Sequence, residues 1–222
     1  MLQQTQVERV IPFYRKFIKK FSTAKKLAAA PLSEVLKTWQ GLGYNRRAKM
    51  LRGAASELAS AGTRLNLIAE LEKLPGVGPY TARAIAAFAH NEDVTFVETN
   101  IRTVIVHHFF PKKKKVSDTE VEKTLIQTLP KGKAREWYNA LMDYGAYLKR
   151  SGISHNARSK KYVKQPKFAG SLREARGAIV REYTKGVTSH ARLVNLFGPL
   201  RKAQMKGALE ALVAEGLISE SP

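Results

Sequence analysis

The sequence predicts an all-α fold, and three observations support that prediction. In the first segment, apolar residues recur at three- and four-residue spacing, at Val7, Ile11, Tyr14, Phe17 and Ile18. Glycine or proline stands at the ends of several such segments, where helices commonly stop or start. The first 150 residues contain no convincing alternation of apolar and polar side chains, which is the pattern of a half-buried strand. We therefore expect helices joined by short turns.

The expected helices follow in order along the chain. A short helix ends at the Gly41-Leu42-Gly43 turn, and a longer one is closed by Gly62. Pro79 begins another helix after a glycine turn, because proline at the first helical position loses no helical hydrogen bond. After the helix of the first segment, the expected helical ranges are 33–39, 46–61, 68–74, from 79 onward, 100–110, 118–129 and 134–150.

The last third of the chain has a different character. Residues 154–167 are polar and basic without an acid, which indicates a linker, taken here as 151–167. Three further helices are expected at 171–183, 189–197 and 200–214, with a short strand at 217–219. This order suggests a small winged-helix-like module over 168–222, next to a main domain over 1–150. The alternative is a three-helix cap on the main domain.

The charge of the chain points to a polyanionic partner. It carries 39 Lys+Arg against 18 Asp+Glu, a formal net charge of +21. Cations that neutralise phosphates release condensed counterions, so nucleic acid is favoured over anionic lipid or a merely soluble basic protein. The sequence has no apolar run long enough for a membrane span and no signal peptide, so we expect a cytoplasmic protein, nucleoid-associated in a prokaryote.

The most specific segment is Leu74-Pro75-Gly76-Val77-Gly78-Pro79-Tyr80-Thr81-Ala82. Two glycines two positions apart permit a tight turn, and the following helix presents unpartnered N–H groups at its start. Such a turn can hold a phosphate without reading the base sequence. Small residues after Tyr80 allow close packing of the two helices. The alternative is an ordinary corner between helices.

This hairpin resembles that of the helix-hairpin-helix (HhH-GPD) DNA glycosylase superfamily, which includes endonuclease III and the MutY-type adenine glycosylases. Three further segments resemble the adenine glycosylases, in the same order. They are Met1 to Val7 (MLQQTQV), Gly41 to Tyr44 (GLGY) and Met142 to Ala146 (MDYGA). The resemblance covers about residues 1–150. It implies the helical glycosylase fold and the removal of a base from duplex DNA.

The resemblance also implies which residues act. The family's catalytic carboxylate lies about twenty residues beyond the hairpin, before a helix that opens with asparagine, and here Glu98 and Asn100 hold those places. The family usually has aspartate, so Glu98 is a departure. A carboxylate there stabilises the positive charge that develops on the sugar; the alternative role of Glu98 is to favour a helix start. Tyr80 stands where lyase-competent members carry lysine, which implies a monofunctional glycosylase, unless Tyr80 only packs in the core.

Two further departures bear on function. The adenine glycosylases protonate the leaving base with a glutamate two residues before their Met-Leu-Gln-Gln segment, a place that would precede Met1. We expect a chain start that is set too late. Most members also follow their Gly-Ala with four cysteines that hold an iron–sulfur cluster, but this chain has no cysteine, so no cluster, no other cofactor and no metal site are expected. The family's module that checks for 8-oxoguanine is not visible.

The expected DNA contacts come from three segments. Gln4, Leu42 and Tyr44 resemble side chains that fill the gap left by a flipped base, although Leu42 and Tyr44 could instead form a buried turn. The hairpin residues Gly76, Val77, Gly78, Tyr80 and Thr81, together with Thr5, Arg46 and Arg47, complete the expected DNA-binding set. His107 and His108 have no metal-ligand partners at useful spacing.

Together these features predict a glycosylase of base excision repair that hydrolyses the N-glycosidic bond of mispaired adenine opposite guanine or 8-oxoguanine. Its partner would be double-stranded DNA with a mismatched or damaged base, and it would act as a monomer. Two alternatives stay open. One is removal of thymine or uracil from mismatches with guanine. The other is a non-catalytic protein that binds damaged DNA.

Overall fold

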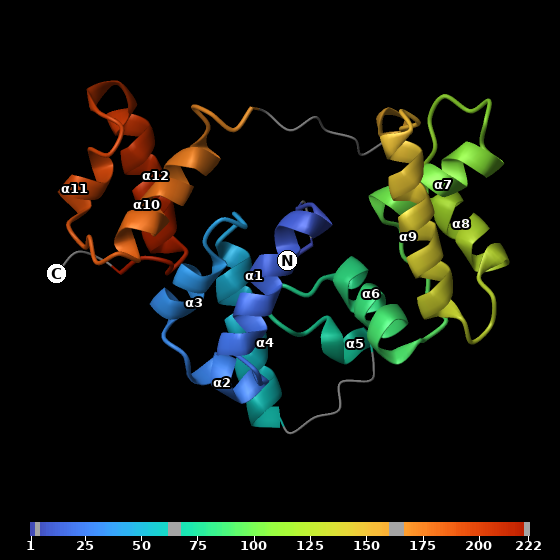
Figure 1. Cartoon of the computed structure of the whole chain (residues 1–222), viewed down its shortest axis with the longest axis horizontal. Coiled ribbons are helices and arrows are strands. Elements are labelled where there is room, and N and C mark those ends of the chain that lie inside the picture. Colours follow the sequence, from blue (N-terminus) through green and yellow to red (C-terminus); the bar gives the residue numbers. More distant parts are fainter. Residues whose placement is uncertain (3–4, 62–67, 160–166, 220–222) are drawn as a thin grey trace. The chain divides into compact units, whose positions relative to one another are not determined.

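The computed structural model describes residues 1–2, 5–61, 68–159 and 167–219. Its regular structure in these ranges is helical, with one isolated bridge between Val116 and Ser159, which confirms the all-α prediction (Figure 1). The chain forms two compact units. Unit 1 is Met1–Thr63 with Pro166–Pro222, and unit 2 is Arg64–Gln165.

Unit 1 joins the two ends of the chain. Its elements are α1 (Val7–Lys20), α2 (Ala24–Ala29), α3 (Leu32–Trp39), α4 (Arg46–Ala61), α10 (Leu172–Tyr183), α11 (His190–Val194), the 3₁₀ helix η2 (Pro199–Arg201) and α12 (Lys202–Ala214). Both ends contribute to one hydrophobic core. Trp39 and Leu36 of α3 share that core with Ile179 of α10 and Leu212 of α12. The tail therefore packs with the N-terminal helices. The compact units divide the expected domain 1–150 after residue 63, and the second division, at 165–166, lies close to the expected end of the linker at 167.

The helix over the first segment is present, but the side that it buries differs from the prediction. Val10 and Phe17 are buried, and the Phe17 ring packs edge-on against Trp39 at a centroid distance of 5.9 Å. Val7, Ile11, Tyr14 and Ile18 are exposed. Sequence spacing predicts that a helix has an apolar stripe, but the packing partners decide which side is covered.

The tail forms its three helices, and the strand expected at 217–219 is not formed. Leu217 and Ile218 are buried in the core of unit 1 as part of a turn after α12. A winged helix needs paired strands, so the winged-helix detail of the prediction is not confirmed. The tail is tied to the N-terminal helices through the Gln40–Thr184 side-chain hydrogen bond and through Lys49, which donates to the Glu215 carbonyl.

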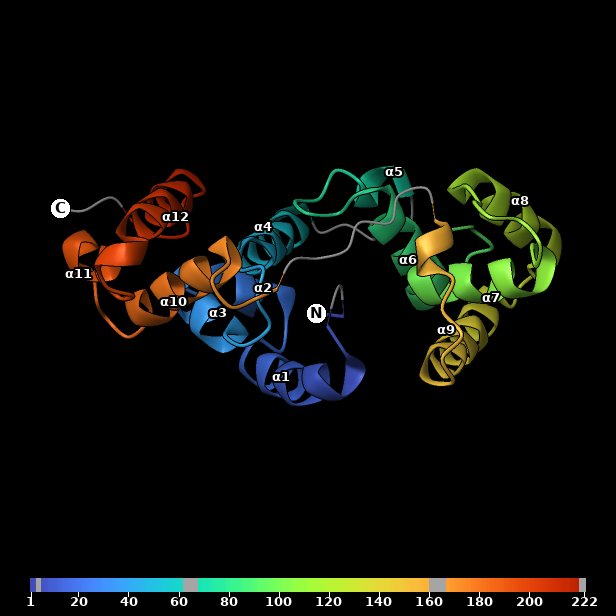
Figure 2. The ribbon, with the colours of Figure 1, turned by 90° about the horizontal axis from the view of Figure 1, so that it is seen from above.

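Unit 2 is built from α5 (Ile68–Leu71), α6 (Pro79–His90), α7 (Thr99–Phe109), α8 (Asp118–Thr128), α9 (Ala134–Arg150) and the 3₁₀ helix η1 (Asn156–Arg158). Figure 2 shows α7, α8 and α9 gathered in one group. Buried Ile101 and Ile105 of α7 pack with Leu125 of α8 and Tyr138 of α9. A capping box at Ser117 and Glu120 begins α8, because each residue satisfies an N–H group of the other.

Gly145 sets the closest approach between α7 and α9. A Cβ atom built on Gly145 would lie 2.3 Å from the carbonyl oxygen of Asn100. Any side chain there would push α9 away from the start of α7. The glycine in the Met142–Ala146 segment thus has a packing reason, which is to let α9 lie against Asn100.

The segment after α9 packs on unit 2 as far as it is described. The Val116 amide donates to the Arg158 carbonyl at 3.0 Å, and the His155 ring stacks on His107 with centroids 5.5 Å apart. Residues 153–159 are thus fixed by contacts. Residues 160–166 of the expected linker lie outside the described residues. Among the helices of the described ranges, none is both long and apolar enough to cross a membrane.

Candidate functional site

The glycine hairpin joins α5 to α6 as the sequence predicts. Gly76 has φ +77°, which favours glycine, and the Val77 amide donates to the Leu74 carbonyl at 3.1 Å to close the turn. Gly78 is the N-cap of α6 and Pro79 opens the helix. The first N–H groups of α6 have no partner within the helix and carry the positive end of its dipole. The hairpin therefore has the geometry of an anion-binding site.

Gly78 is not required by packing within the protein. Its φ is −96°, which any residue adopts, and no protein atom lies within 4 Å of a Cβ built there. The space beside it is open, so a phosphate can approach the backbone closely. Ala82, one turn further on, is fully buried. This burial agrees with the expected close packing of the second hairpin helix.

Glu98 begins α7. It is the N-cap residue, and its Oε2 accepts a hydrogen bond from the backbone amide of Asn100 at 2.5 Å. Glu98 therefore does cap the start of a helix. The carboxylate has about four hydrogen-bond acceptor positions, and the cap uses one of them. The hydrogen bond of the cap fixes the orientation of the carboxylate at the N-terminal, positive end of the α7 dipole.

Tyr80 lies in the same neighbourhood. Its ring packs edge-on against Phe96, two residues before Glu98, with centroids 5.8 Å apart. Burial, and then the Glu98 charge, raise the pKa of Tyr80 above its ordinary value, so the phenol stays neutral and can donate a hydrogen bond. Tyr80 is 41% exposed. It is therefore partly packed and partly open to a ligand.

Lys149 completes this cluster, and sequence reasoning missed it. Its Nζ donates to Asn100 Oδ1 at 2.6 Å. Burial lowers the pKa of Lys149, while the Glu98 charge raises it. Lys149 follows Gly145 by four residues, so both lie on the side of α9 that faces Asn100. The sequence shows the four-residue spacing between Gly145 and Lys149. That spacing indicates a functional position only when the contact between α9 and α7 is known.

The Gly41–Tyr44 loop of unit 1 follows α3. A Cβ atom on Gly41 would lie 2.6 Å from Phe13 Cζ, and Gly41 has φ +96°, so this position requires glycine. The Trp39 indole donates to the Gly43 carbonyl at 3.0 Å. Tyr44 has φ +50°, which is uncommon for a bulky residue and is often found at functional sites.

The loop presents only one of its two expected side chains. Leu42 is 5% exposed and belongs to the core of unit 1, so its burial argues against the expected insertion into DNA. Tyr44 is 42% exposed. The candidate for filling the gap left by a flipped base is therefore Tyr44.

Arginines flank the exposed tyrosine. The Arg47 guanidinium lies 5.2 Å from the centroid of the Tyr44 ring and 5.6 Å from that of Trp39. Arg46 is exposed at the start of α4, and Thr5 lies in the same unit. All three line one cavity with Tyr44. Gln4 lies outside the described residues.

The two histidines of α7 stack on aromatic rings, His107 on His155 after α9 and His108 on Tyr144 of α9. His107 Nδ1 lies 3.2 Å from His155 Nε2, and His108 Nε2 lies 2.9 Å from the Tyr144 hydroxyl. Among the described residues, no group of three or more His, Asp or Glu side chains could hold a metal ion. We assign the histidines a structural role.

These elements define a helical protein with an anion-binding hairpin, a helix-capping carboxylate beyond it and a strongly basic surface. The chain belongs to the HhH-GPD superfamily of base excision DNA repair proteins, whose family model matches residues 1–131. The match confirms the resemblance seen in the hairpin and the prediction of a DNA glycosylase of base excision repair.

Three individual similarities refine the placement. The chain is 35% identical to an adenine DNA glycosylase of Mycolicibacterium smegmatis over 245 residues, covering 100% of this chain and 82% of that one. It is 37% identical to an adenine DNA glycosylase of Buchnera aphidicola, covering 67% of this chain and 43% of the relative, so it spans less than half of that protein. The solved structure of a thermostable thymine-DNA glycosylase matches with a TM-score of 0.55 and 25% identity, covering 65% and 69% of the two chains.

The residues present do not fit the iron–sulfur cluster that many members hold. Such clusters are bound by cysteine thiolates, and this sequence contains none. After Gly145 the chain continues α9 through Lys149 and Arg150.

Gly78→Asp is predicted to separate folding from DNA binding. Aspartate is a good N-cap residue and meets no protein atom here, so the free energy of unfolding should stay unchanged or rise by about a few tenths of a kcal/mol. Its charge would repel a phosphate at the start of α6, so duplex affinity should fall about tenfold or more. Fluorescence anisotropy with duplex DNA, beside chemical unfolding, measures both quantities.

The matched control is Gly78→Asn, which has the same shape and capping ability without the charge. It should bind DNA more tightly than Gly78→Asp. Equal affinity of the two variants would show that the hairpin does not contact phosphate.

Proposed function

We propose that this chain is a monofunctional adenine DNA glycosylase that removes mispaired adenine from duplex DNA. The observation that carries the proposal is the placement of Glu98 as the N-cap of α7, in the same unit as the hairpin and beside Tyr80 and Lys149. The adenine glycosylases among its relatives support adenine as the base.

Binding begins with the phosphates. The hairpin offers the N–H groups at the start of α6, and Arg46 and Arg47 add charge beside the exposed Tyr44. Extrusion of a base costs a few kcal/mol, and stacking of an aromatic ring in the gap returns ~1–3 kcal/mol. In the proposal Tyr44 takes that place, because its ring is exposed in the structure.

The chemistry breaks the bond between the sugar C1′ and adenine N9. The bonding electron pair leaves with adenine, which takes up a proton, and the sugar becomes positively charged. The Glu98 carboxylate stabilises that charge, held in place by the Asn100 amide. A water molecule then adds to C1′ and loses a proton, which yields free adenine and an abasic site.

Two side chains close to Glu98 have roles in the proposal. Lys149 holds the Asn100 side chain and places a positive charge nearby. Burial raises the pKa of Tyr80 further above neutral pH, so its phenol stays protonated, and it supplies no amine for a Schiff base. In this proposal water is therefore the final nucleophile, and cleavage of the DNA strand is left to another enzyme. The protein acts as a monomer in the cytoplasm.

The test is single-turnover release of the base from duplexes that hold adenine opposite 8-oxoguanine or opposite guanine. Thymine·guanine and uracil·guanine duplexes run beside them. Release of adenine supports the proposal. Release of thymine or uracil alone would mean that the substrate is a pyrimidine and not adenine. No release of any base, together with tight binding, would indicate a non-catalytic DNA-binding protein.

A further inference from the structure

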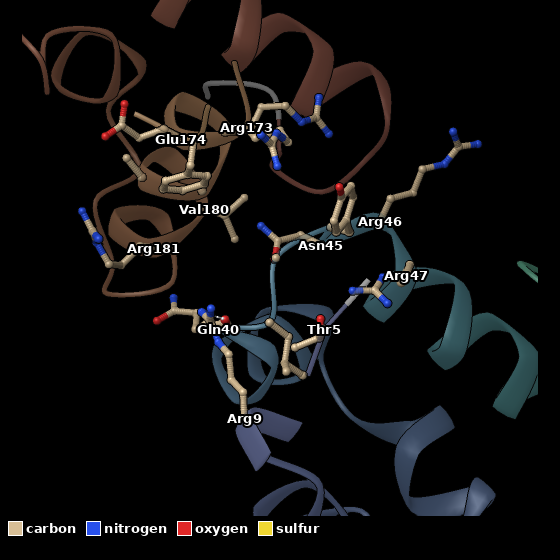
Figure 3. Close-up of a pocket in the computed structure, with 18 of the residues that line it drawn as sticks. Thr5, Arg9, Gln40, Asn45, Arg46, Arg47, Arg173, Glu174, Val180 and Arg181 are labelled. Atoms are coloured by element: carbon tan, nitrogen blue, oxygen red, sulfur yellow. Dashed lines mark hydrogen bonds between the residues drawn. The ribbon is translucent and has the colours of Figure 1, made fainter. Parts of the chain in front are cut away.

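Unit 1 contains a cavity of about 1230 Å³ with two walls. One wall is the Gly41–Tyr44 loop with the start of α4, which carries Arg46 and Arg47. The other wall is α10 of the C-terminal tail. Figure 3 shows Arg173 and Arg181 on the α10 side and Arg46 and Arg47 on the α4 side.

The cavity is strongly basic. The arginines that line it are Arg9, Arg46, Arg47, Arg173, Arg176 and Arg181. The acids that line it are Glu174 and Glu215, and both carboxylates are paired. Glu174 accepts from Arg201 at 2.8 Å, and Glu215 accepts from Arg176 at 2.6 Å. Hydrogen bonds from Arg201 and the Gly170 amide also lower the pKa of Glu174, so it stays ionised and bound to Arg201.

The α10 wall places its cations by helical spacing. Arg173, Gly177 and Arg181 follow at four-residue intervals, which puts them on one side of the helix. Arg181 Nε also lies 3.3 Å from Glu182 Oε1, so a phosphate would share this guanidinium with that carboxylate. The small residue between the two arginines leaves room, since no atom lies within 4 Å of a Cβ built on Gly177. The Arg173 guanidinium lies 5.8 Å from the centroid of the Phe168 ring, which restricts its position before any ligand arrives.

Arginines arranged in this way suit phosphate, because the guanidinium fork matches phosphate oxygens and stays charged. The exposed Tyr44 ring shares the cavity, so a duplex that meets Tyr44 brings its own backbone to these arginines. The family model ends at residue 131, so α10 lies outside the region it matches.

We infer that the α10 wall, through Arg173 and Arg181, binds backbone phosphates of the duplex beside the nucleotides that Tyr44 contacts. The inference deepens the proposed function, since it takes the same duplex DNA as partner, and it gives the C-terminal helices a role in holding DNA. Phosphate contacts position a protein without reading bases. The contribution of α10 is therefore independent of the lesion and of the base opposite to it.

The test compares the double variant Arg173→Ala/Arg181→Ala with Lys25→Ala/Lys26→Ala, which removes the same charge from exposed positions of α2 in the same unit. Affinity for a fully paired duplex is measured across salt concentrations. Loss of two phosphate contacts should lower the slope of log affinity against log salt by about two. Affinity should fall about tenfold at low salt. The lysine variant should keep the slope of the unmodified chain.

Several outcomes would overturn the inference. One is an equal loss in both double variants, which would mean that net charge alone matters. Another is an unchanged slope in the arginine variant. A third, measured with adenine·guanine and adenine·8-oxoguanine duplexes beside the fully paired one, is a loss confined to one opposite base, which would indicate recognition of the base rather than of phosphate. Because a fully paired duplex undergoes no excision, the result does not depend on whether adenine is released.

A second measurement keeps the test valid if the arginine variant is unstable. The chain contains no cysteine, so Arg181→Cys introduces a single thiol. A duplex that carries a disulfide-activated tether on its backbone should cross-link to Arg181→Cys in higher yield than to Lys26→Cys. Equal yields would contradict a phosphate site on α10.

Discussion

Replacement of Glu98 by glutamine is expected to lower the single-turnover rate of base release at least about 100-fold. Glutamine keeps the length of the side chain and can still accept a hydrogen bond from the Asn100 amide, but it has no negative charge to set against the developing charge on the sugar. The free energy of unfolding should change by less than ~1 kcal/mol, because the cap is retained.

The matched control is Glu98→Asp, which restores the residue that the superfamily usually carries. Aspartate is the better N-cap, so this variant should be at least as stable as the unmodified chain. It keeps the charge, so base release should stay within about tenfold of the unmodified rate. If Glu98→Gln retained full activity, the carboxylate would be a helix cap and nothing more, and the catalytic assignment would be wrong.

The sequence predicted best those helices whose ends are determined by residues close by in the chain. Gly76 and Pro79 act through backbone conformation within a few residues, so the hairpin and the start of α6 could be predicted without tertiary information. The position of Glu98 before α7 is likewise a local signal. The six-residue helix α2 was missed, because it is too short to display a helical period.

Other features depend on packing and had no local signal. Leu42 and Tyr44 stand two residues apart in one loop, yet Leu42 is buried and Tyr44 is exposed, and the core of unit 1 decides between them. The tail shares that core with α1 and α3, so its role could not be derived from its own sequence. The contact between Lys149 and Asn100 joins residues 49 positions apart. It exists because Gly145 lets two helices touch.

Gly145→Ala is expected to destabilise the protein, although alanine is the better helix former. In an open helix the replacement would stabilise by about 1 kcal/mol. Here the added methyl group would lie 2.3 Å from the Asn100 carbonyl oxygen and 2.8 Å from its Cα, and both atoms belong to the backbone. Such overpacking typically costs about 1–3 kcal/mol, so the steric cost outweighs the gain from helix propensity. Chemical unfolding followed by circular dichroism measures the balance.

The control for helix propensity is Gly207→Ala in α12, where no atom lies within 4 Å of the built Cβ, so this variant should be more stable than the unmodified chain. The two variants should therefore shift the unfolding midpoint in opposite directions. Gly145→Ala should also slow base release, because a displaced Asn100 moves both the amide that holds Glu98 and the acceptor of Lys149. A Gly145→Ala protein as stable and as active as the unmodified chain would contradict the close packing of α9 on the start of α7. The same result would contradict the claim that this packing positions the Glu98 carboxylate through Asn100.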